Sequence, residues 1–131
     1  MTSSNWRSIL GWTDEQIEEL RFAGFSFLRE GQYNKALLFF EALVIIDPSN
    51  TYDMQTLGAL HLQMSNGKKA IEILNRALLL DPSHELTQLN KVKALLLSSE
   101  KNQAFALAKE LEKSQDLTIA NDVSALLTTY Y

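Results

Sequence analysis

The chain has 131 residues, a length that fits one domain, and its 46% apolar content is enough for a globular core. The net charge of −4 argues against nucleic-acid binding, which needs clustered lysine and arginine. The absence of cysteine excludes disulfides and cysteine metal sites. The sequence shows neither a signal-peptide pattern nor an apolar run of about 18 residues, so we predict a cytoplasmic protein that does not insert into membranes.

The first predicted element is a short helix over residues 3 to 10. Ser3, Ser4 or Asn5 would cap this helix, and Gly11 would end it.

Three apolar residues of this helix, Trp6, Ile9 and Leu10, share one face by their spacing. We expect this face to pack on the helices that follow. The alternatives are a dimer contact or insertion into the groove of a neighbouring molecule.

A longer helix is predicted from Thr13 to the residue before Gly31. Thr13 and Gln16 have the spacing of a capping box, and Trp12 and Ile17 that of a hydrophobic staple.

The remaining predicted elements are all helical. Their approximate ranges are 34–46, 52–65, 68–80, 84–98, 101–113 and 117–129. The last helix carries Ile119, Val123, Leu126, Leu127 and Tyr130 on one face, as expected of a helix that covers the end of a stack.

An internal repeat organises the chain. The only two prolines, Pro48 and Pro82, occupy the same place in the phrases "IIDPSN" and "LLDPSH". The same offset relates four further pairs, which are Gly24 and Gly58, Ala36 and Ala70, Asp47 and Asp81, and Ser49 and Ser83. A third copy, weaker in sequence, follows these two. This offset, about 34 residues, is the period of a unit that consists of two antiparallel helices.

This pattern resembles the tetratricopeptide repeat (TPR) family. The resemblance implies an all-α fold, a right-handed superhelical α-solenoid of three helix pairs with an N-terminal extension and a C-terminal capping helix. We expect a single domain over residues 1–131. The predicted repeats cover about 17–50, 51–84 and 85–116, and the capping helix covers about 117–129.

The repeated residues have physical roles. Gly24 and Gly58 lack a Cβ and would let paired helices approach closely. Each proline ends a unit because it cannot continue a helix. Ser49 and Asn50, and likewise Ser83 and His84, follow the prolines and offer capping groups for the next helix.

No catalytic or metal site is predicted. His61 occupies the aromatic position of the second repeat and is expected to be packed, whereas His84 lies at a turn and is expected to be solvated. Neither has partners at metal-ligand spacing, and no phosphate-loop, dinucleotide or nucleophile-elbow motif is present. We therefore predict no enzyme activity and no cofactor.

The resemblance places a peptide-binding groove on the first helices of the repeats. The implied inward residues are Arg21, Phe25, Leu28, Tyr52, Gln55, Ala59, Leu62, Leu86, Leu89, Lys93 and Leu96. This set is mainly apolar, with Arg21 and Lys93 as isolated charges, and suits an extended apolar segment. Some members, such as Phe25 and Leu89, could instead belong to the core.

A carboxylate clamp, which some family members use to grip a chain terminus, is not predicted. Arg21 fits one clamp position, but Phe25 stands where the family has asparagine, and Gln55 replaces another clamp residue.

The stretch "FLREGQYNKALLFFEALVIIDPSN" resembles the first repeat of bacterial type III secretion chaperones, with Gly31, Tyr33, Ala36 and the pair Phe39–Phe40. This resemblance covers residues 14 to 113 and implies a bacterial cytoplasmic chaperone. Its partner would be a secretion substrate or a secretion-apparatus subunit. The alternatives are a generic scaffold that joins partners, or an accessory or regulatory domain of an enzyme. A homodimer is also possible.

Overall fold

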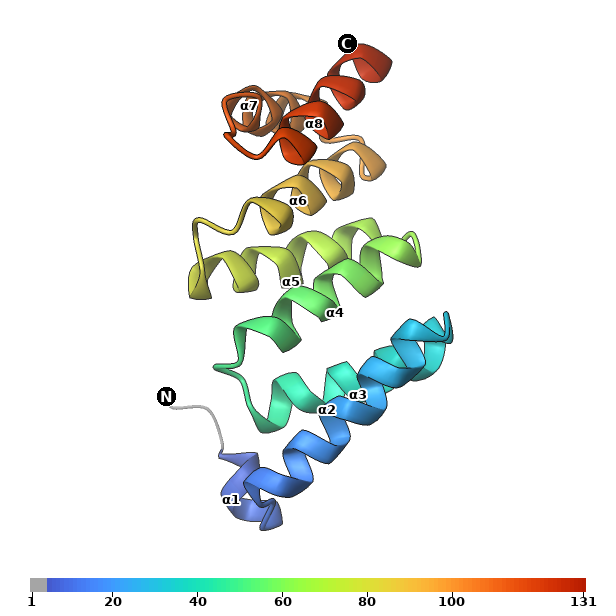
Figure 1. Cartoon of the computed structure of the whole chain (residues 1–131), viewed down its shortest axis with the longest axis vertical. Helices are drawn as coiled ribbons and strands as arrows, with labels where there is room; N and C mark the ends of the chain where they lie inside the picture. Colours follow the sequence, from blue (N-terminus) through green and yellow to red (C-terminus); the bar gives the residue numbers. More distant parts are fainter. Residues whose placement is uncertain (1–4) are drawn as a thin grey trace.

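The computed structural model describes residues 5–131, which fold into eight α-helices without a strand. Their bounds are α1 Trp6–Leu10, α2 Asp14–Arg29, α3 Tyr33–Ile46, α4 Thr51–Gln63, α5 Gly67–Leu80, α6 Glu85–Leu97, α7 Lys101–Leu111 and α8 Leu117–Tyr130. Consecutive helices stack along the long axis, with α1 at one end and α8 at the other (Figure 1). The predicted all-α solenoid is confirmed.

The helices begin where the sequence supplies a capping side chain. Asn5 caps α1 and Gly11 ends it with a φ of 70°, whereas the other two candidate caps, Ser3 and Ser4, lie outside the described residues. Thr13 and Gln16 form the predicted capping box at the start of α2. These caps satisfy backbone N–H groups that the first helical turn leaves without partners.

The helices that follow the prolines begin in a similar way. Asn50 accepts a hydrogen bond from the backbone N–H of Asp53, and the Nδ1 atom of His84 accepts one from the backbone N–H of Thr87. His84 is therefore half buried and structural, which corrects the expectation that it is simply solvated.

All three helix pairs turn through the same backbone motif, at positions separated by the repeat period. Gly31, Ser65 and Ser99 adopt left-handed conformations with φ of 74°, 61° and 62°. In each turn the next residue donates its N–H to a carbonyl five residues back, at 2.8–2.9 Å. This is the Schellman arrangement, which satisfies the carbonyls at a helix C-terminus. The third copy, weak in sequence, thus shares the turn geometry of the first two.

The predicted close approach of paired helices occurs at both repeated glycines. A Cβ on Gly58 would lie 2.6 Å from Leu74 Cδ2, and one on Gly24 would lie 3.0 Å from Phe39 Cβ. Leu74 is fully buried and cannot move aside, so α4 and α5 pack at a distance that only glycine allows.

The core runs through the stack as connected clusters. One joins α2 to α5 around Phe40 and Leu57, and another joins α6, α7 and α8 around Leu95 and Val123. Ala70, Leu74 and Ala94 connect α5 with α6. The array is therefore held by contacts between neighbouring helices, as in a solenoid.

The terminal helix α8 covers the end of the stack. Ile119 and Val123 are buried, and Leu126 and Leu127 are partly buried against the same cluster. Tyr130, predicted on this face, is instead 49% exposed because it lies at the last turn, beyond the covered surface.

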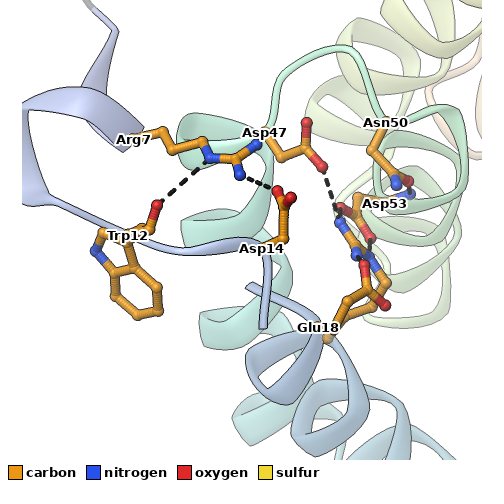
Figure 2. Close-up of polar contacts among 8 residues, drawn as sticks. Arg7, Trp12, Asp14, Glu18, Asp47, Asn50 and Asp53 are labelled. Carbon is orange, nitrogen blue, oxygen red and sulfur yellow. Dashed lines mark hydrogen bonds and ion pairs between the residues drawn. The ribbon is translucent and has the colours of Figure 1, made fainter. Parts of the chain in front are cut away.

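The N-terminal helix α1 does not pack as expected. It has no buried residue, and the exposed fractions of Trp6, Ile9 and Leu10 are 45%, 63% and 58%. The helix is too short to lie along a neighbour, and only a few of its residues approach α3. Arg7 holds the segment instead, through the carbonyl of Trp12 and an ion pair with Asp14 (Figure 2). Self-association through the exposed residues stays a prediction.

Candidate functional site

A groove of about 460 Å³ opens across the first helices of the three helix pairs. The helix α4 contributes the largest share of the lining residues. Leu28 of α2 lies on one side of them, and Leu86 of α6 lies on the other. The lining residues are Leu28, Tyr33, Tyr52, Gln55, Thr56, Ala59, Leu60, Gln63, His84, Leu86, Thr87 and Asn90.

The chemistry of this lining is uncharged and mixed. Leucine and tyrosine side chains supply apolar surface, while Gln55, Gln63 and Asn90 supply carboxamides. Among the described residues, no aspartate, glutamate, lysine or arginine belongs to the lining. Such a surface can bury apolar side chains of a ligand and can also hydrogen-bond its main chain.

Five of the eleven predicted groove residues line this groove together. They are Leu28, Tyr52, Gln55, Ala59 and Leu86.

The structure places three other predicted residues within or against the core. Leu89 is 1% exposed because α8 lies against α6 and covers it, so it cannot line an open groove. Leu62 and Leu96 are half buried and pack on core clusters.

The remaining predicted residues lie outside the groove lining. Phe25 is 38% exposed, and the guanidinium of Arg29 lies over its ring. Lys93 is half buried.

Arg21 is not the isolated charge that the sequence suggested. Its Nε and Nη2 atoms donate to the two carboxylate oxygens of Asp53 at 2.8 and 2.7 Å, and Nη2 also donates to Asp47 at 3.1 Å. Glu18 forms a further ion pair with the same side chain. Figure 2 shows Glu18, Asp47 and Asp53 close to one another.

This network connects α2 with the beginning of α4. Asp53 is fully buried, and burial raises the pKa of its carboxyl, while the hydrogen bond from Arg21 acts in the opposite direction. The hydrogen bond with Asp53 in turn raises the pKa of Arg21, which keeps the guanidinium charged. A bidentate pair of this kind fixes the orientation of both side chains.

The network lies where helix packing is sparse. α4 packs directly on α6, but α2 has no comparable contact with α4. The first helix pair is joined to α4 mainly through α3. Arg21 and Asp53 thus link α2 with α4 and do not line the groove.

Sequence reasoning missed seven lining residues. Most of them, such as Thr56, Thr87 and Asn90, follow a predicted residue by one position, so the groove-facing stripe is wider than the family positions imply. Tyr33 is the first residue of α3 and His84 caps α6, so neither lies within the first helices on which the family positions are counted.

His61 is packed as predicted, with 5% exposure. Its Nε2 atom has no hydrogen-bond partner among the described residues and lies 3.7 Å from Glu41 Oε1. Burial lowers the pKa of the imidazole, and the Glu41 carboxylate acts in the opposite direction.

Within residues 5–131, no three histidine, aspartate or glutamate side chains lie close enough together to hold a metal ion. None of the described helices combines the length and apolar character needed to cross a membrane.

The tetratricopeptide repeat family matches residues 27–96, which is more than half of the chain. The chain therefore belongs to the tetratricopeptide repeat family. A curated relative, anaphase-promoting complex subunit 3 of Schizosaccharomyces pombe, is 26% identical over 89 residues. The match covers 68% of this chain but only 13% of that protein.

Solved structures share the fold over most of the chain. The type III secretion chaperone SycD of Yersinia enterocolitica, in complex with a peptide of the translocator YopD, has a TM-score of 0.79 and 23% identity, with coverage of 89% of this chain and 93% of that one. The TPR domain of Arabidopsis OM64 has a TM-score of 0.77 and 18% identity, with coverage of 89% and 98%. The chain thus resembles type III secretion chaperones in fold.

Proposed function

We propose that this protein is a protein-binding module that acts as a bacterial cytoplasmic type III secretion chaperone. It holds an extended apolar segment of a secretion substrate or secretion-apparatus subunit in the groove between α2, α4 and α6. The observation that carries the proposal is the open groove of about 460 Å³, whose lining within residues 5–131 has no charged residue. The chaperone SycD, similar in fold, is described in complex with a translocator peptide.

The groove provides a physical basis for storage of such a client. An apolar segment exposed in water favours aggregation, and burial of one leucine-sized side chain contributes about 1.5–3 kcal/mol. Ordering of the segment opposes part of that gain. A groove that buries a few such side chains therefore binds a segment reversibly, as release for export requires.

The proposal is tested by co-expression with candidate type III secretion substrates. We expect the client to stay soluble and to co-purify with the wild-type chain. Gln55→Glu and Leu86→Asp put a negative charge into the groove and should abolish both effects. The matched control is Leu79→Asp, because Leu79 is 83% exposed and lies outside the groove lining.

A generic scaffold that joins partners is the second candidate, since the OM64 TPR domain has the same fold. The scaffold hypothesis predicts the opposite effects for the groove variants and the control variant. Groove variants would leave the partner bound, and a substitution such as Leu79→Asp on the outer helices would release it.

A further inference from the structure

The groove continues into a second hollow of about 330 Å³, and the two share His84 and Leu86. This hollow lies where α5 joins α6 and where α8 begins, and these two turns are on the same side of the stack in Figure 1. A segment that follows the groove past Leu86 therefore enters the second hollow.

The second hollow has the opposite chemistry to the uncharged groove. Asp81, Glu85 and Asp116 line it, and neither lysine nor arginine of the described chain does. None of the three carboxylates forms an ion pair with another of residues 5–131.

One oxygen of each of these carboxylates accepts a hydrogen bond within the chain. Asp81 Oδ1 accepts from Ser83, Glu85 Oε1 accepts from Ser114, and Asp116 Oδ1 caps α8. The second oxygen of each has no hydrogen-bond partner within the described part of the chain. Three such oxygens around one hollow can accept the N–H groups of an ammonium or a guanidinium.

We infer that the occupant of the groove is an extended protein segment with two parts. Uncharged apolar side chains lie over α2 and α4, and a lysine or arginine lies beyond Leu86, beside Asp81, Glu85 and Asp116. This inference rests on the proposed function, because it takes the groove as the binding site. It adds a charge requirement at one end of the client segment.

The test uses short fluorescein-labelled peptides with a common centre of alternating leucine and serine. One end carries two lysines, two serines or two glutamates, and each pair is placed at either end in separate peptides. Binding to the full chain is followed by fluorescence anisotropy. At about 50 mM salt, one of the two lysine peptides should bind about three- to tenfold more tightly than the serine peptide, and the advantage should shrink at high salt.

The protein variants identify the origin of that advantage. Asp81→Asn, Glu85→Gln and Asp116→Asn together remove the charge but keep the hydrogen-bond acceptors that support the fold. This triple variant should bind the lysine and serine peptides equally. A matched triple variant, with Glu15→Gln, Glu19→Gln and Asp122→Asn, removes equal charge from other surfaces and should keep the preference.

The outcomes separate the two proposals. If the serine peptide binds but the lysines confer no advantage, the charge requirement is wrong and the groove function stands. If the lysine advantage survives in the first triple variant, the assignment to these carboxylates is overturned. If no peptide binds, the groove function itself fails.

Discussion

The guanidinium of Arg21 and the carboxylate of Asp53 form a buried pair between residues 32 positions apart in the chain. The Arg21 side chain is 12% exposed and that of Asp53 is fully buried. Removal of one member of such a pair leaves a buried charge without its partner, which is more costly than removal of both.

We therefore expect Arg21→Met to lower the free energy of unfolding by about 3–5 kcal/mol, as measured by urea denaturation. The double variant with Arg21→Met and Asp53→Leu should recover most of that loss. Arg29→Met is the control, because Arg29 is exposed on the same helix, and it should change stability by less than about 0.5 kcal/mol. Equal effects of the two arginine substitutions would contradict a role for the pair.

His61 gives stability a dependence on pH. Its folded-state pKa is lowered by burial, so the unfolded state binds the proton more readily. The contribution to stability is complete above the unfolded pKa of about 6.5 and is lost as pH falls through the folded pKa.

The corresponding prediction is a loss of unfolding free energy as the pH falls below about 6.5. His61→Phe restores the aromatic residue of the repeat pattern and removes the titrating group, so the loss should shrink. A pH profile that is unchanged in His61→Phe would disprove the assignment.

At the scale of elements, the three turns between paired helices differ in the residue at the left-handed position. Gly31 adopts its left-handed conformation without strain, while Ser65 and Ser99 adopt the same conformation with a Cβ. For residues other than glycine this conformation costs about 1–2 kcal/mol.

Ser65→Gly and Ser99→Gly should each raise the free energy of unfolding by about 0.5–1 kcal/mol. Gly31→Ser should lower it by about 1 kcal/mol, because it introduces the same strain into the first turn. Thermal and urea denaturation measure these differences. Destabilisation by both glycine substitutions would mean that the serine side chains support the turns in another way.

The sequence predicted the elements well because their signals are local. Capping residues, prolines and the repeat period set the beginning and end of each helix, and the all-α solenoid follows from them. The period also implied the close approach at Gly24 and Gly58. The strained turns at Ser65 and Ser99 went unnoticed because serine does not itself indicate a left-handed conformation.

The groove was harder to predict because its lining depends on contacts between distant elements. Leu89 has the same position in its repeat as Gln55, yet only Leu89 lies under α8. Arg21 occupies a position that faces a groove in the family, but Asp53 and Asp47 draw it into a network. Neither partner can be deduced from spacing along one helix.

At the scale of the whole molecule, α8 takes the place that another repeat would occupy. It buries the apolar face of α6 and α7 that the stack would otherwise expose. In a linear array, loss of the terminal unit destabilises its neighbour first.

Ile119→Ala should therefore cost about 2–4 kcal/mol, since Ile119 is 6% exposed in that interface. Hydrogen exchange should quicken in α6 and α7 and stay unchanged in α2 and α3. Leu117→Ala is the control on the same helix, because Leu117 is 74% exposed and its loss should have little effect. Uniform acceleration across all helices would argue for one cooperative unit.

The sparse contact between α2 and α4 affects how well the groove can adapt to bound segments of different bulk. Besides the Arg21–Asp53 pair, α2 has little direct packing on α4, whereas α4 packs directly on α6, so the two sides of the groove are not held alike. We expect the part of the groove beside Leu28 to accept apolar side chains of different sizes. The part beside Leu86 should accept only side chains of one size and shape. A groove with one adjustable side and one rigid side can accept segments of different bulk in a single register.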